Sequence, residues 1–310
     1  MLNLTPYIEQ FLDYLKILNF SQLTIRHYAH SLKQFEKFII PYNLTSLTEL
    51  STEQLKAYQK HLCFRQNRYQ QTDSVEAQNR YLTQVKKFFD FLKEARLLSY
   101  NPAEKIRLAK EPQRLPKPAL SYQEMEELLS QPDITTILGY RDRTILEVLY
   151  SSGIRRSELS RLKIQDADYK QGVLRINRGK GNKDRVTPLG KIACTYIENY
   201  LKGVRPFFQE ARESEALFMS VRGEALGVQG IDKLISKYAK QARLNKEITA
   251  HTFRRSCATG MIRNKANVMH VKELLGHSSL DTVQVYCDLT ITDLKEAHQQ
   301  CHPREKMITD

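Results

Sequence analysis

The residues of this sequence best suited to bind an anion lie in two short motifs, each of which contains an arginine. HTFRRS places His251 three residues before Arg254, so the two side chains share a face if the stretch is helical. SSGIRRSEL places Arg155 shortly after a glycine, at the expected start of a helix, where backbone donors and a guanidinium can together hold an anion. These three side chains could hold one phosphate group.

A nucleophile and a proton donor for such a phosphate occur in two further motifs. LLGHSSLDTVQVY places His277 nine residues before Tyr286, and Gly276 permits a turn between helices, so the phenol could meet the same phosphate. Lys180 lies in the basic hairpin 175–185, whose turn could lower it into a groove. An ammonium is well suited to protonate a leaving oxygen.

Metal-dependent phosphodiester chemistry is not favoured by the sequence. It would require clustered carboxylates, but no DxD or similar constellation lies beside a candidate nucleophile. We therefore expect no metal and no cofactor. The cysteines are odd in number, scattered and free of any CxxC pair, which indicates neither a disulfide framework nor a zinc site: Cys63, Cys194, Cys257, Cys287 and Cys301.

Four motifs, GIRRSEL, GKGNKDR, HTFRRS and LLGHSSLDTVQVY, occur in this order and resemble the signature boxes of the tyrosine recombinase (phage integrase) family, close to its Xer branch. The resemblance spans nearly the whole chain. It implies transesterification without ATP or metal, in which a tyrosine becomes joined to the 3′ phosphate and a lysine acts as general acid. The residues it implies are Tyr286 as nucleophile, around a phosphate held by Arg155, Lys180, His251, Arg254 and His277.

Other residues near these motifs allow two interpretations. Glu158 follows Arg155 by three, and it could orient Arg155 through an ion pair or form an ordinary exposed helix pair. Tyr150 and Tyr238 are expected in the core. Phosphate contacts are the favoured interpretation, and a solvated hairpin the alternative, for Arg178, Lys183 and Arg185.

Three positions depart from the family pattern without removing a catalytic group. Arg255 stands where histidine is usual, Arg156 where an apolar residue is common, and Asp288 where histidine often follows the nucleophile. These departures leave open whether the exchange serves chromosome dimer resolution, integration or transposition. The target DNA sequence is also open, because DNA-facing side chains and DNA deformability determine it.

Three functions remain compatible with the sequence. The first is an active recombinase on specific double-stranded DNA sites, as a homo-tetramer or with a second recombinase, and with a possible accessory protein. The second is an inactive DNA-binding or architectural protein of the same fold. The third is a type IB topoisomerase or telomere resolvase, against which the compact size and the Xer-like tail DLKEAHQQCHPR count.

The elements that must position these residues are predicted to be mainly helical. Apolar residues three or four apart predict two helices between Pro6 and about Ile39, a third from a Ser51–Gln54 capping box through Leu62, and a fourth over 77–92. Further helices are predicted after the proline-rich basic stretch. They cover 122–130, 139–151, 188–203, 228–243, 251–263, 268–275, 279–286 and 292–300, with one β-hairpin over 173–186.

The predicted fold is therefore mainly α with a small β-sheet, in two domains. Residues 1–105 are predicted to form a four-helix domain, 106–118 a linker, and 119–310 a second domain. The resemblance implies that the first is a SAM-like core-binding domain and the second a catalytic domain ending in an exchange helix. The formal net charge of +13, with a basic excess in both halves, suits a polyanionic partner such as DNA. Without a long apolar run or a signal peptide, we expect a cytoplasmic protein that does not bind membranes.

Overall fold

The computed structural model describes residues 2–66, 70–112, 118–177, 184–208 and 212–276. The chain divides into two compact units, Met1–Leu115 and Pro116–Asp310. Each unit has a hydrophobic core of its own, which is what a domain needs in order to fold as one body.

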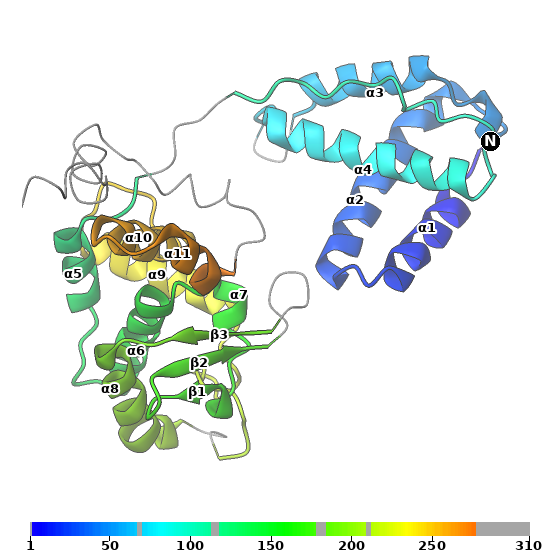
Figure 1. Cartoon of the computed structure of the whole chain (residues 1–310). Coiled ribbons are helices and arrows are strands. Elements are labelled where there is room, and N and C mark those ends of the chain that lie inside the picture. Colours follow the sequence, from blue (N-terminus) through cyan, green and yellow to red (C-terminus); the bar gives the residue numbers. More distant parts are fainter. Residues whose placement is uncertain (1, 67–69, 113–117, 178–183, 209–211, 277–310) are drawn as a thin grey trace, which may run out of the picture. The chain divides into compact units, whose positions relative to one another are not determined.

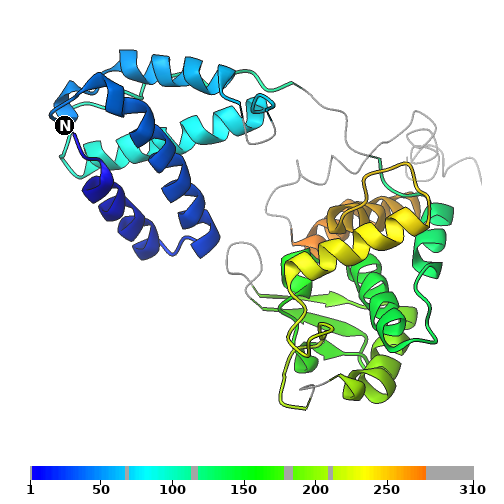
Figure 2. The same ribbon diagram turned by 180° about the vertical axis from the view of Figure 1, so that it is seen from behind.

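Four long helices build the first unit, in the order that the sequence predicted (Figures 1 and 2). Side chains cap their first turns: the Ser21 hydroxyl accepts a hydrogen bond from the backbone of Thr24, and Ser51 forms the predicted capping box with Gln54. The apolar faces meet in an aromatic core in which Phe88 is fully buried. The helices are α1 (Thr5–Ile17), α2 (Gln22–Ile39), α3 (Thr52–Phe64) and α4 (Val75–Glu94).

The chain that follows α4 packs back on this unit. Asn79 donates to the carbonyl of Ala109 at 2.8 Å and accepts from its N–H at 2.9 Å, and Lys86 donates to the carbonyl of Ile106 at 2.6 Å. The side chain of Ile106 is buried in the core of the first unit. Residues 106–109, which open the segment expected to be a linker, are therefore packed on α4.

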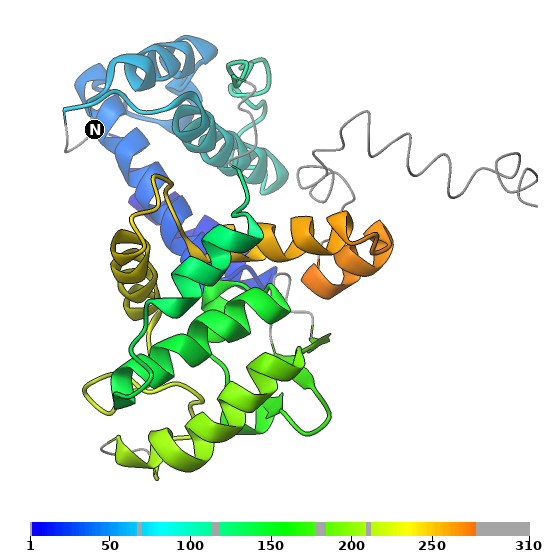
Figure 3. The ribbon, with the colours of Figure 1, turned by 90° about the vertical axis from the view of Figure 1, so that its left-hand side faces the viewer.

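The second unit joins a small antiparallel sheet to seven helices among its described residues (Figures 1 and 3). This arrangement confirms the predicted fold class, mainly α with a small sheet. The sheet order is β1 (Ala167–Asp168), β2 (Val173–Ile176) and β3 (Arg185–Pro188). The helices are α5 (Tyr122–Ser130), α6 (Ile137–Ser152), α7 (Arg156–Leu159), α8 (Lys191–Asn199), α9 (Val228–Gln241), α10 (Ala250–Arg263) and α11 (Val268–Leu275).

Strand β1 was not predicted, because two residues are too short to show alternation. Its pairing with β2, Ala167 opposite Leu174, supplies the order that its own sequence lacks. Helix α6 packs against both α8 and α10, and α11 lies beside α10. The first turn of α10 and the end of α6 are thereby brought close together.

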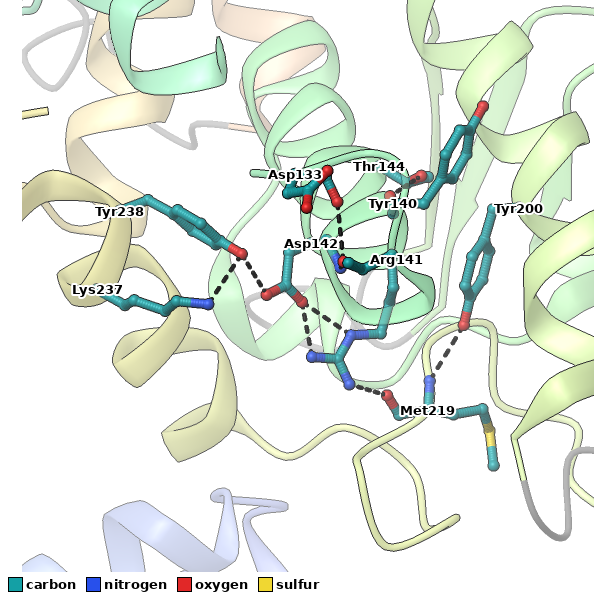
Figure 4. A network of polar contacts seen from close by, with 11 residues as sticks. Asp133, Tyr140, Arg141, Asp142, Thr144, Tyr200, Met219, Lys237 and Tyr238 are labelled. Atoms are coloured by element: carbon teal, nitrogen blue, oxygen red, sulfur yellow. Dashed lines mark hydrogen bonds and ion pairs between the residues drawn. The ribbon is translucent and has the colours of Figure 1, made fainter. Parts of the chain in front are cut away.

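A buried polar network ties α6 to α9 (Figure 4). Asp142 accepts hydrogen bonds from Arg141 Nε at 2.9 Å and Nη2 at 2.6 Å, and from the Tyr238 hydroxyl at 2.8 Å. Arg141 Nη1 also donates to the carbonyl of Met219 at 2.8 Å. Burial, followed by the negative charge of Asp142, raises the pKa of Tyr238. Tyr238 thus lies in the core as predicted, and Tyr150 packs against the same core.

Substitution Tyr238→Phe should lower the free energy of unfolding by about 1–3 kcal/mol, because Asp142 loses a donor inside the core. Tyr122→Phe is the matched control, because the Tyr122 side chain is exposed at the start of α5 and the substitution removes only a solvent-exposed hydroxyl. Urea unfolding of the two variants beside the parent protein measures the difference. Equal stabilities would contradict the role assigned to this network.

Candidate active site

The two predicted arginines are brought together by the end of α6 and the first half of α10. Gly153 caps α6 with φ at +59°, and a Cβ there would lie 2.7 Å from Leu275 Cδ2, so both the turn and the close packing require glycine. Arg254, on α10, is 2% exposed. Its Nη1 donates to the carbonyl of Gly153 at 2.7 Å and its Nη2 to that of Leu275 at 2.6 Å. One guanidinium therefore joins α6, α10 and α11.

Arg155 approaches the same place from α7, where it is the N-cap residue. Its Nη1 donates to Glu158 Oε1 at 2.9 Å, and its Nη2 donates to the carbonyl of Gly276 at 3.3 Å. Arg254 and Arg155 thus bind the successive carbonyls of Leu275 and Gly276. Both guanidiniums bind the two residues that directly precede His277.

His251 lies one helical turn before Arg254, near the N-terminus of α10, as the spacing predicted. The residue is exposed, yet its pKa is lowered from the ordinary 6.5. Partial loss of hydration is the largest cause, followed by the positive charges of Arg254 and Arg155. The imidazole is therefore mostly neutral at pH 7, a form that can accept a proton.

Glu158 decides between the two interpretations that the sequence left open, because its side chain is only 1% exposed. It accepts hydrogen bonds from the Arg155 backbone at 2.9 Å and from the Arg155 side chain. Burial raises the pKa of Glu158, but hydrogen bonds and charge from Arg185 and Arg155 outweigh it and lower the pKa to about 2. Glu158 is a buried anion that orients Arg155, and its position three residues after Arg155 was the available signal.

Arg185, expected to contact phosphate, begins β3 and faces Glu158 instead of solvent. Its Nη1 and Nη2 donate to the two carboxylate oxygens at 2.9 and 2.8 Å, and its side chain is 14% exposed. Arg156, one of the departures from the family pattern, forms an exposed ion pair with Asp232 of α9. The described site is thus a cluster of arginines around one buried carboxylate.

The remaining predicted site residues lie outside the described residues. These are Lys180, His277, Tyr286, Arg178 and Lys183. In the described stretches, no group of three or more His, Cys, Asp or Glu side chains could hold a metal ion. No helix of those stretches is long and apolar enough to cross a membrane.

Comparison with known proteins gives the same family from two directions. The model of the phage integrase family matches residues 118–292, and that of the phage integrase N-terminal SAM-like domain matches residues 8–96. The chain belongs to the phage integrase family, the tyrosine recombinases.

Comparison with individual proteins identifies the branch of the family. Over 298 residues the chain is 32% identical to the tyrosine recombinase XerD of Staphylococcus epidermidis, covering 96% of this chain and 98% of that one. It is 33% identical to the tyrosine recombinase XerC 2 of Ralstonia nicotianae, covering 97% and 86%. The solved pre-cleavage complex of the XerH site-specific recombinase with its difH substrate matches with a TM-score of 0.67 at 25% identity, covering 94% and 82%. The chain is a site-specific tyrosine recombinase of the Xer branch.

Replacing Glu158 with glutamine should lower the free energy of unfolding by about 3–5 kcal/mol at neutral pH, because two partly buried guanidiniums lose their counter-charge. The folded-state pKa is depressed, so this stabilisation is present above pH 4.5 and is lost as the pH falls toward about 2. Denaturant unfolding of parent and variant should therefore give curves that converge with acidification.

The exposed pair offers a matched control. Asp232→Asn also removes the carboxylate partner of an arginine, but at the surface, where about 1 kcal/mol or less is expected. Equal losses in the two variants, or a difference for Glu158→Gln that stays constant down to pH 3, would show that Glu158 is not the buried counter-charge of the site.

Proposed function

We propose that Tyr286 attacks a DNA phosphate held by Arg155 and Arg254, and that the resulting 3′-phosphotyrosyl bond conserves the energy for joining a second strand. The observation that carries this proposal is the convergence of the two guanidiniums on the carbonyls of Leu275 and Gly276. Those residues lie in the motif that contains Tyr286, directly before His277. The catalytic groups of three distant motifs would then share one phosphate.

The proposed step balances in bonds and protons. The Tyr286 oxygen forms a bond to phosphorus while the bond from phosphorus to the 5′ oxygen breaks. A free phenol has a pKa of about 10, so the neutral His251 imidazole accepts its proton while the arginines stabilise charge on the non-bridging oxygens. Lys180 donates a proton to the leaving 5′ oxygen, and His277 assists charge stabilisation. Attack by a partner strand's 5′ hydroxyl reverses the step.

Arg155 is suited to this work because it remains partly accessible. Its side chain is 18% exposed, and the two bonds to Glu158 and Gly276 engage two of the five N–H donors of a guanidinium. The backbone N–H of Arg155 also donates to the Glu158 carboxylate, which fixes the main chain of Arg155. Arg155 can therefore present a preorganised donor to phosphate at small entropic cost.

The DNA partner and the assembly follow from the reaction. Exchange between two duplexes breaks four strands, so four active sites are required, in a homo-tetramer or in a tetramer shared with a second recombinase. The positive charge of the chain favours DNA binding, and XerH was solved on its difH substrate. The proposed setting is the cytoplasm, where the reaction would serve chromosome dimer resolution, integration or transposition, with an accessory protein where the site requires one.

The nucleophile can be tested with a nicked suicide substrate built on a site identified by sequencing DNA that crosslinks to the chain in cells. The parent protein should form a covalent adduct that Tyr286→Phe cannot form, because phenylalanine lacks the attacking oxygen. Tyr122→Phe, which removes an exposed hydroxyl, should still form it. An adduct in Tyr286→Phe would exclude this tyrosine, and unimpaired binding without any adduct in the parent would favour an inactive DNA-binding protein.

The role of His251 predicts a pH dependence. If the neutral imidazole accepts the phenolic proton, the single-turnover cleavage rate should fall as the pH drops through a value below 6.5. His251→Gln should be slower by about 100-fold at pH 7 and should lose this acidic limb. His270→Gln, an exposed position on α11, should keep both the rate and the limb. An acidic limb that persists in His251→Gln would assign it to another group.

A further inference from the structure

Arg185 lies at the end of the hairpin whose loop contains Lys180. It begins β3 and is paired with Ile176 of β2, and this pair is the last one before the chain enters the loop. The side chain leaves the strand toward α7, where both Nη groups bind Glu158. The base of the loop is therefore attached to the carboxylate that orients Arg155.

Arg185 also packs against the turn that ends α11. A Cβ on Gly276 would lie 2.9 Å from Arg185 Cδ and 3.0 Å from its Nε, so the arginine side chain lies directly over this glycine. Gly276 has φ at +64°, and its carbonyl accepts the hydrogen bond from Arg155. The Arg185 side chain thus links three segments of the site: its own hairpin, α7 and the turn before His277.

These bonds make Arg185 a poor phosphate ligand. Arg254 binds neutral carbonyls, and Arg155 gives Glu158 a single side-chain N–H. Both Nη groups of Arg185 instead form a bidentate ion pair with a carboxylate that is 1% exposed, and its Nε is buried. Turning the guanidinium toward DNA would leave Glu158 with one partner fewer in a buried position, which is strongly unfavourable. Lysine could not replace this arrangement, because its ammonium cannot bind both carboxylate oxygens in the same planar fork.

We propose that Arg185 is a positioning residue: through Glu158 and Gly276 it holds the Lys180 hairpin against Arg155, and it does not contact DNA phosphate. The inference rests on the proposed function, in which Lys180 protonates the leaving 5′ oxygen. Arg185 never touches the reacting atoms in this scheme. It fixes the point from which Lys180 reaches them.

DNA binding separates positioning from phosphate contact. Arg185→Gln should bind the suicide substrate within about twofold of the parent, with the same slope of affinity against salt, whereas loss of a phosphate contact would reduce that slope by about 0.9. Its cleavage rate at saturating protein should fall by about 10- to 100-fold, and Arg185→Lys should recover only part of it. Arg175→Gln is the matched control, because Arg175 is an exposed arginine on β2 of the same hairpin, and it should cleave at the parent rate once saturated.

Leaving-group chemistry tests the link to Lys180. A substrate with sulfur at the 5′-bridging position releases a thiolate, which needs no proton at neutral pH because thiols have pKa values near about 8.5. Arg185→Gln should therefore cleave this substrate at nearly the parent rate, which general loss of structure would not allow. A reduced salt slope in Arg185→Gln, or a cleavage defect of equal size on both substrates, would overturn the proposal.

Failure of the proposed function would be visible separately. Lys180→Ala should also be restored by the sulfur-bridged substrate, and if it is not, the general-acid role assigned to Lys180 is wrong. The positioning role of Arg185 can then still be tested. DNA affinity and the cleavage rate at saturating protein are measured for Arg185→Gln, Glu158→Gln and the double variant. If the double variant cleaves no more slowly than the slower single variant, Arg185 acts through Glu158. If the two rate defects multiply in the double variant, Arg185 does not act through Glu158.

Discussion

The site depends on the guanidinium of Arg254, which is almost fully buried and bound to the carbonyls of Gly153 and Leu275. A buried cation is tolerated only where hydrogen bonds compensate its lost hydration, and here two of its donors bind backbone carbonyls of two other segments. The end of α6 and the end of α11 are therefore held at fixed positions on α10. Arg155 follows Gly153 by two residues, so the hydrogen bond from Arg254 to the Gly153 carbonyl also restricts the position of Arg155.

The concentration of positive charge in this region needs a counter-charge, and Glu158 supplies it. Without it, the partly buried guanidiniums of Arg155 and Arg185 would lie close together with no counter-charge between them. The carboxylate screens that repulsion within the protein and still leaves the surface of the site positive, which a phosphate requires. Partial loss of hydration, followed by the same positive field, lowers the pKa of His251, so the proposed phosphate ligands have a mostly neutral imidazole beside them.

The arginines proposed to hold the phosphate also have structural roles. Arg254 joins three helices and Arg155 binds the carbonyl of Gly276. The network of Arg141, Asp142 and Tyr238 lies near the other end of α6. Both arrangements use planar guanidinium geometry to bind backbone carbonyls or a carboxylate from a fixed direction. These bonds fix the direction of each guanidinium in the protein without DNA.

The fold class and the local elements could be predicted from the amino-acid sequence, because periodic apolar residues, serine caps and glycines act over a few residues. The Ser51 capping box, the four-helix order and the shared face of His251 and Arg254 all follow from such local rules. The remaining features of the site became visible only in the folded protein, because they depend on contacts between residues that are distant in the chain. Burial of Glu158, its pairing with Arg185, the packing of Arg185 on Gly276 and the short strand β1 need partners from other elements, and no local spacing encodes which side chain will face which.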